Sequence, residues 1–215
     1  MGGAVLFDLD GTLLDSLEDI GDAMNAVLAS LGHPTHTMRA YQTLVGEGAR
    51  ELARRALPPE ARGEVDHVLA RYKAHYRANL VVKSKPYDGI ATMLEALARA
   101  SIPMAVVTNK PHDVAVDIVA QVFAPHTFAH VIGQRDGHPH KPDPSGALAV
   151  VRALGVDPAQ AFFVGDTDTD MRTARNAGMR AIGVTWGFRD RDELERHGAH
   201  VIVDQPDEIV RLVVP

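Results

Sequence analysis

The sequence alternates, from residue 86 onward, between short apolar runs and longer segments with helical periodicity. The apolar runs lie at 104–108, 161–164, 180–184 and 200–203. The helical segments lie at 89–100, 111–122, 144–154, 167–177 and 191–197. Each apolar run is short and is closed by turn or polar residues, which is typical of a strand buried on both faces. Strand and helix in repetition predict an α/β fold, a Rossmann-like parallel sheet with helices on both sides.

Residues 4–9 form one more apolar run of this kind, but a helical segment without strands follows it. Apolar residues recur at helical spacing over 17–31 and again over 65–76. Ser16 and Asp19 have the spacing of a capping box at the start of the first of these helices. We therefore expect an α/β core at 1–15 and 86–215, interrupted by a helical cap domain at 16–85. Such an insertion can lie over the end of the sheet as a lid.

Charge and composition exclude several classes of protein. The chain has 22 Lys and Arg against 28 Asp and Glu, a net charge of −6, and no basic stripe. Nucleic-acid and membrane partners are therefore not expected. Cysteine is absent, which excludes disulfides and thiol chemistry. No apolar run approaches the ~18 residues of a membrane span and no signal peptide is evident, so a cytoplasmic protein is expected. The sequence does not indicate an oligomeric state.

Four polar clusters directly follow apolar runs, at the carboxyl edge of the expected sheet, where such folds bind ligands. The clusters are Asp8-Leu9-Asp10-Gly11-Thr12, Thr108-Asn109-Lys110, Lys141-Pro142-Asp143-Pro144 and Gly165-Asp166-Thr167-Asp168-Thr169-Asp170. Two carboxylates as close as Asp8 and Asp10 repel each other and need a cation, a shared proton or a bound positive ligand at neutral pH. Asp166 and Asp170 add further negative charge. Oxygen ligands without Cys or His favour Mg²⁺.

The remaining polar residues of these clusters are suited to binding an anion. Lys141 supplies positive charge from a loop that two following prolines stiffen. Thr12, Thr108 and Asn109 offer short hydroxyl and amide donors. Together they predict a phosphate site assembled from separate segments.

The four clusters, in this order, resemble the signature motifs of the haloacid dehalogenase superfamily, and the insertion is similar to its helical cap class. The resemblance implies that Asp8 is a nucleophile and Asp10 an acid and base, with Lys141 completing the catalytic set. It also implies that Asp8, Asp166 and the backbone carbonyl of Asp10 bind the metal. Asp170 is expected to orient these ligands or Lys141.

A shorter resemblance lies in the expected cap. Residues 45–52 are similar to the cap loop of phosphoglycolate phosphatases, which implies substrate contacts by Gly46 and Arg50. A helix-initiating turn and a solvated arginine are the alternatives. Trp186 and Phe188, after the strand at 180–184, are expected to serve packing.

The function that this resemblance implies is Mg²⁺-dependent hydrolysis of a small phosphorylated metabolite, with 2-phosphoglycolate the favoured substrate, through an aspartyl-phosphate intermediate. A phosphomutase of the β-phosphoglucomutase type would use the same four motifs. A non-catalytic binding protein that kept the fold is the alternative outside enzymes.

Overall fold

The computed structural model describes residues 3–125 and 127–214, and within them six parallel strands form one sheet. In spatial order these are β5 (His130–Gln134), β4 (Met104–Pro111), β1 (Val5–Phe7), β6 (Phe162–Gly165), β7 (Arg180–Val184) and β8 (Val201–Val203). Leu6 of β1 pairs with Ala105 on one side and with Phe163 on the other. The predicted parallel α/β sheet is confirmed, and β5 is an addition at its edge.

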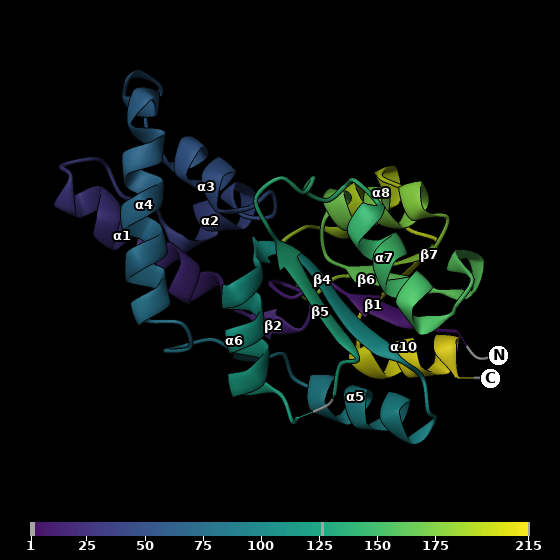
Figure 1. The fold of residues 1–215 in the computed structure, drawn as a ribbon. Helices are drawn as coiled ribbons and strands as arrows, with labels where there is room; N and C mark the ends of the chain where they lie inside the picture. Colours follow the sequence, from purple (N-terminus) through teal and green to yellow (C-terminus); the bar gives the residue numbers. More distant parts are fainter. Residues whose placement is uncertain (1–2, 126, 215) are drawn as a thin grey trace.

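Helices cover both faces of the sheet (Figure 1). On one face lie α5 (Ile90–Arg99), α6 (His112–Val122) and α10 (Pro206–Val213). On the other lie α7 (Ser145–Leu154), α8 (Asp168–Ala177) and α9 (Arg191–Arg196), and the short η2 (Pro158–Gln160) precedes β6. Val5 and Phe7 belong to the first hydrophobic cluster and Leu6 to the second, because alternate side chains of a strand point to opposite faces.

The segment between β1 and α5 carries a group of helices that lies to one side of the sheet (Figure 1). It contains α1 (Leu17–Ser30), α2 (Met38–Leu44), α3 (Ala49–Ala56), the 3₁₀ helix η1 (Pro59–Glu64) and α4 (Val65–Ala78). The chain leaves the core through β2 (Leu14–Asp15) and returns through β3 (Lys85–Pro86), which pair antiparallel. Throughout the described ranges, every helix is too short or too polar to cross a bilayer. We refer to α1–α4 as the cap; its boundaries at 15/16 and 85/86 stay a prediction.

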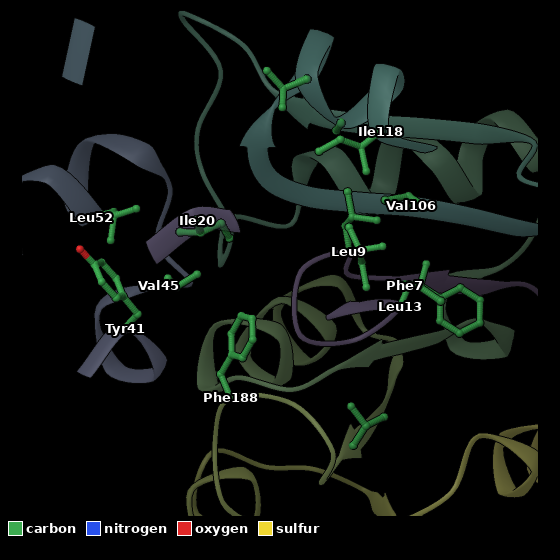
Figure 2. Close-up of a cluster of buried hydrophobic side chains, with 14 of the residues drawn as sticks. Phe7, Leu9, Leu13, Ile20, Tyr41, Val45, Leu52, Val106, Ile118 and Phe188 are labelled. Atoms are coloured by element: carbon green, nitrogen blue, oxygen red, sulfur yellow. The ribbon is translucent and has the colours of Figure 1, made fainter. Parts of the chain in front are cut away.

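One hydrophobic cluster runs from the core into the cap (Figure 2). It joins Leu9 and Leu13, which follow β1, to Tyr41 and Leu52 of the cap helices. Phe188, after β7, belongs to the same cluster. The cap therefore packs against the carboxyl edge of the sheet through buried side chains.

The capping box expected at the start of α1 is wrong. The Ser16 hydroxyl donates instead to Oδ1 of Asp10, at 2.6 Å. The Asp19 carboxylate accepts hydrogen bonds from the backbone amides of Val82 (3.1 Å) and Ser84 (2.8 Å), on the segment that returns to the core. Both side chains are therefore engaged in contacts between distant segments, which sequence spacing does not reveal.

Candidate active site

Three acidic side chains from two segments meet at the carboxyl edge of the sheet. Asp8 follows β1, Asp166 follows β6, and Asp170 lies in the first turn of α8. Each offers a carboxylate oxygen, and these oxygens lie within 4.8 Å of one another. All three residues are buried. The structure thus brings Asp8 together with Asp166, which lies 158 positions later in the sequence, and with Asp170.

Lys141 lies between two of these carboxylates. Its Nζ is 2.9 Å from Oδ1 of Asp8 and 2.7 Å from Oδ1 of Asp170. Burial alone would lower the pKa of Lys141, but the charges of Asp170 and Asp8 outweigh it and the pKa lies above its usual range. Lys141 is therefore a fixed ammonium group in the site.

Asn109 holds the loop that carries Lys141. Its Oδ1 accepts a hydrogen bond from the Lys141 amide at 2.8 Å, and its Nδ2 lies 3.2 Å from the Lys141 carbonyl. The same Nδ2 lies 3.2 Å from the Gly46 carbonyl in the cap. The side chain proposed to bind phosphate is therefore occupied with joining three segments, and Thr108 beside it lines the cavity.

Asp170 orients Lys141 from the start of α8. Its Oδ2 accepts hydrogen bonds from the Thr167 amide (3.1 Å) and the Thr167 hydroxyl (2.7 Å), while Oδ1 accepts from Lys141. The Asp170 carboxylate thus both caps α8 and fixes the position of Lys141. Gly165 permits this packing, because a Cβ there would lie 2.2 Å from Cβ of Asp170.

Residues 186–188, which the sequence analysis assigned only to packing, enclose Asp166. Its Oδ2 accepts from the Phe188 amide at 2.9 Å, and its Oδ1 accepts from the Thr12 hydroxyl at 2.8 Å. The Trp186 indole donates to the Thr12 carbonyl at 3.0 Å. A Cβ on Gly187 would lie 2.3 Å from Cβ of Asp166, so only glycine fits between these two aromatic residues. The Thr12 hydroxyl is thereby committed to Asp166.

The two central carboxyls are hard to ionise in the absence of a cation. Burial, with the charges of Asp170 and Asp8, raises the pKa of Asp166 to about 8. Burial raises the pKa of Asp8 to about 6, although Lys141 opposes the shift. Among the described residues, Oδ1 of Asp8 has no well-directed hydrogen bond despite its proximity to Lys141. Buried oxygen donors with too little compensating positive charge fit a hard divalent ion such as Mg²⁺.

Asp10 is set apart from this group. Its two side-chain oxygens lie 2.8 and 2.9 Å from Nζ of Lys110. Asp10 nevertheless lines the same cavity as Asp8. The Asp10 carboxylate is therefore directed to Lys110 and Ser16 and not into the group of three acidic side chains. The role of Lys110 was missed, because nothing in the sequence links it to Asp10.

A cavity of about 210 Å³ separates the core from the cap. Asp8, Asp10 and Thr108 contribute to it from the core. The cap contributes a largely apolar wall, which is formed by Ile20, Val45, Leu52, Tyr72 and Tyr76. Helix α4 also adds two cationic side chains, Lys73 and Arg77. The space can hold an ester whose phosphate meets the core and whose leaving group meets the cap.

The two cap residues expected to contact substrate are placed differently. Gly46 lines the cavity. Arg50 is exposed, and its Nη1 bonds to Asp66 at the start of α4. The structure therefore does not bring Arg50 into the cavity, because its guanidinium is paired on the outer surface of the cap.

Fold and site together define an α/β protein with an acidic, lysine-bearing site at the carboxyl edge of its sheet, closed by a helical insertion. The chain belongs to the haloacid dehalogenase-like hydrolase family, whose profile matches residues 5–184.

Individual relatives cover almost the whole chain. A phosphoglycolate phosphatase of Agrobacterium fabrum is 36% identical over 205 residues, which span 93% of this chain and 87% of that protein. An N-acetylmuramic acid 6-phosphate phosphatase of Pseudomonas aeruginosa is 33% identical, spanning 96% and 92%. A crystal structure from Lactobacillus delbrueckii subsp. bulgaricus, solved as a candidate phosphoglycolate phosphatase, has a TM-score of 0.93 at 31% identity and covers 98% of both chains.

Proposed function

We propose that this phosphoric monoester hydrolase is Mg²⁺-dependent and works through an aspartyl-phosphate on Asp8. The observation that carries the proposal is the position of the Lys141 ammonium, within 2.9 Å of Asp8 and 2.7 Å of Asp170, beside the buried Asp166. A nucleophilic carboxylate, a cation for the phosphate and ligands for a metal thus occupy one site.

The residues divide the first half of the reaction between them. A carboxylate oxygen of Asp8 attacks phosphorus, and the bond from phosphorus to the ester oxygen breaks with its electron pair on that oxygen. Asp10 in its protonated form gives the leaving oxygen a proton. Lys141 attracts the phosphoryl oxygens as negative charge builds on them. Mg²⁺ held by Asp8, Asp166 and the Asp10 carbonyl would withdraw charge from the phosphoryl group.

The second half restores the enzyme. A water oxygen attacks phosphorus while Asp10 takes the proton of that water. The bond from phosphorus to Asp8 breaks, its electron pair returns to the Asp8 carboxylate, and inorganic phosphate leaves. Packing of the cap over the site keeps bulk water out until the alcohol has departed.

We favour 2-phosphoglycolate as substrate, as the named activity of the Agrobacterium relative suggests. The apolar cap wall favours a second candidate, a bulkier ester such as N-acetylmuramic acid 6-phosphate, the substrate in the name of the Pseudomonas relative. Lys73 at the cavity is suited to meet the carboxylate that both compounds carry, whereas the Arg77 guanidinium is already paired with Asp113 and Asp117 of α6.

Release of inorganic phosphate from a panel of esters tests these assignments. The panel contains both candidate substrates, glycerol phosphate and p-nitrophenyl phosphate. The highest kcat/KM for 2-phosphoglycolate supports the favoured substrate, and the highest value for the muramic acid ester supports the second. Phosphoryl transfer to a sugar phosphate without net phosphate release would instead indicate the mutase, and no turnover of any ester would contradict the proposed function.

A further inference from the structure

Lys110 is a buried cation that the mechanism above does not use. It lies near the end of β4, and its side chain is 5% exposed. Its Nζ bonds both oxygens of Asp10, at 2.8 and 2.9 Å. Within residues 3–125 and 127–214, Asp10 is the one acidic side chain in ion-pair contact with it. A cation buried against the proton-transferring carboxyl of the proposed mechanism requires an explanation.

The other side of the Lys110 ammonium is covered by the cap. Nζ lies 4.8 Å from the centre of the Tyr76 ring, which belongs to α4. Tyr76 stacks on Tyr72, one turn earlier, with ring centres 5.6 Å apart and planes 22° from parallel. A cation above an aromatic face is attracted to it, most strongly where water is excluded. The position of Lys110 therefore depends on a core carboxylate and on a cap aromatic.

The hydrogen bonds leave the two oxygens of Asp10 unequal. Oδ1 accepts from Ser16 at 2.6 Å and from Lys110, whereas Oδ2 accepts, among the residues that the structure describes, from Lys110 alone. Oδ2 therefore keeps more free acceptor capacity. Asp10 and Lys110 both line the cavity that contains Asp8. A carboxyl fixed at both oxygens does not have to be reoriented before each proton transfer.

We propose that Lys110 is a positioning residue for Asp10, and that Tyr76 of the cap sets the position of Lys110. The inference rests on the proposed function and assigns a residue to one step of it. In the second half of the reaction, the proton of the attacking water passes to Oδ2 of Asp10 while Lys110 keeps all its protons. The water oxygen forms its bond to phosphorus as the bond from phosphorus to Asp8 breaks. Contact between α4 and β4 thus links cap packing to water activation.

Rapid mixing of Lys110→Met with p-nitrophenyl phosphate tests this step. The p-nitrophenolate ion leaves without a proton, so aspartyl-phosphate formation does not need Asp10. We expect a burst of one p-nitrophenol per active site at a rate within about threefold of wild type, because aspartyl-phosphate formation from this substrate does not depend on Asp10 or on its position. The steady rate that follows should fall about 100-fold, the usual size of a general-base contribution, and KM should not rise.

Three further variants separate positioning from a purely structural role. Lys110→Arg keeps a charged donor and should recover part of the steady rate. Tyr76→Leu removes the aromatic face and should lower the steady rate about three- to tenfold, again with the burst retained. Lys85→Met removes an exposed lysine of β3 and should match wild type. Circular dichroism establishes that each variant is folded.

Two outcomes would overturn the proposal. Burst and steady rates that fall by the same factor would make Lys110 part of phosphate binding or of the fold, and an unchanged steady rate would give it no role. If Lys110→Met fails to fold, a Tyr76→Leu variant with burst and steady rates both at wild-type values overturns it equally. Failure of the underlying function is distinct, because the wild-type enzyme would then form no hydroxylamine-sensitive acyl phosphate on Asp8.

Discussion

Arg189, in the core after β7, donates from Nη2 to the carbonyl of Val45, in the cap after α2, at 3.0 Å. Its Nη1 also bonds the Gln42 carbonyl within α2, and its Nε lies 3.1 Å from Glu193 of α9. The last carbonyls of a helix lack partners within it, so a guanidinium is a favourable cap for them. With Asn109 bonded to Gly46, this contact fastens residues 42–46 of the cap to the core.

Replacing Arg189 with methionine should weaken the attachment of residues 42–46 to the core. Hydrogen bonds from a charged group contribute about 1.5–3 kcal/mol, so KM for the best substrate should rise roughly tenfold or more. The change in kcat should be smaller, since Arg189 does not line the cavity. Steady-state kinetics measure the effect, and amide hydrogen exchange should increase over residues 42–48. Arg211→Met, at an exposed pair with Asp207 on α10, is the matched control. Unchanged exchange over 42–48 would contradict the prediction.

Asp8→Asn should abolish turnover, because an amide side chain cannot form the aspartyl-phosphate. The melting temperature should stay within a few degrees of wild type or rise in metal-free buffer, since the change removes a buried carboxyl whose pKa burial raises to about 6. Phosphate release and thermal unfolding measure the two effects. Activity near that of wild type would exclude Asp8 as the nucleophile.

Removal of divalent ions should stop turnover and reduce stability. Three buried carboxylates whose oxygens lie within 4.8 Å of one another repel until a cation joins them. EDTA should therefore halt phosphate release, and Mg²⁺ should restore it. Ca²⁺ should not, because it prefers looser coordination with more ligands. Full activity in EDTA would remove the metal from the reaction.

The unfolding free energy of the metal-free protein should fall as pH rises. The folded pKa values of Asp166, about 8, and Asp8, about 6, lie above the ordinary 3.8 of an aspartate. The folded chain therefore binds more protons than the unfolded chain between about pH 4 and pH 8. The stability from these protons is fully present below about pH 4 and is lost as pH passes the folded values.

Thermal unfolding across this pH range measures the loss. Saturating Mg²⁺ should offset most of it, because the metal binds the ionised carboxylates. Asp166→Asn should flatten the metal-free profile. A metal-free melting temperature that increases steadily from about pH 5 to pH 8 would show that other groups dominate.

Much of the fold was accessible from the sequence, because buried parallel strands are short apolar runs. The expected run at 180–184 coincides with β7, and four other strands overlap their predicted ranges. The edge strand β5 escaped prediction since most of its residues are only half-buried and its sequence is mixed. The strands β2 and β3 have only two residues each and show no pattern, and α10 was missed because, although amphipathic, it is only eight residues long.

The candidate site, too, could be predicted only in part from the sequence. Asp8, Asp166 and Asp170 were identified because each follows a strand or lies in the first turn of a helix at the carboxyl edge of the sheet. Lys141 lies in the loop before α7 and was identified from its proline-flanked cluster and the resemblance of that cluster to a family motif. Contacts made by backbone groups were not accessible. Two examples are the hydrogen bond from the Phe188 amide to Asp166 and the hydrogen bonds from Arg189 to the end of α2. Each joins segments whose proximity has no local sequence signal.

Gly187→Ala should disable the site while the rest of the fold persists. A Cβ there would lie 2.3 Å from Cβ of Asp166 and 2.4 Å from the Gly11 carbonyl, and backbone cannot yield as a flexible side chain can. Displacing residues 186–188 would remove the Phe188 amide from Asp166. We expect kcat/KM to fall by about 100-fold, since misplacement by ~1 Å costs that much, together with weaker Mg²⁺ activation. Gly63→Ala, where an added Cβ meets nothing within 4 Å, should leave both unchanged. Equal activity of the two variants would show that the close packing over Asp166 has no part in assembling the metal site.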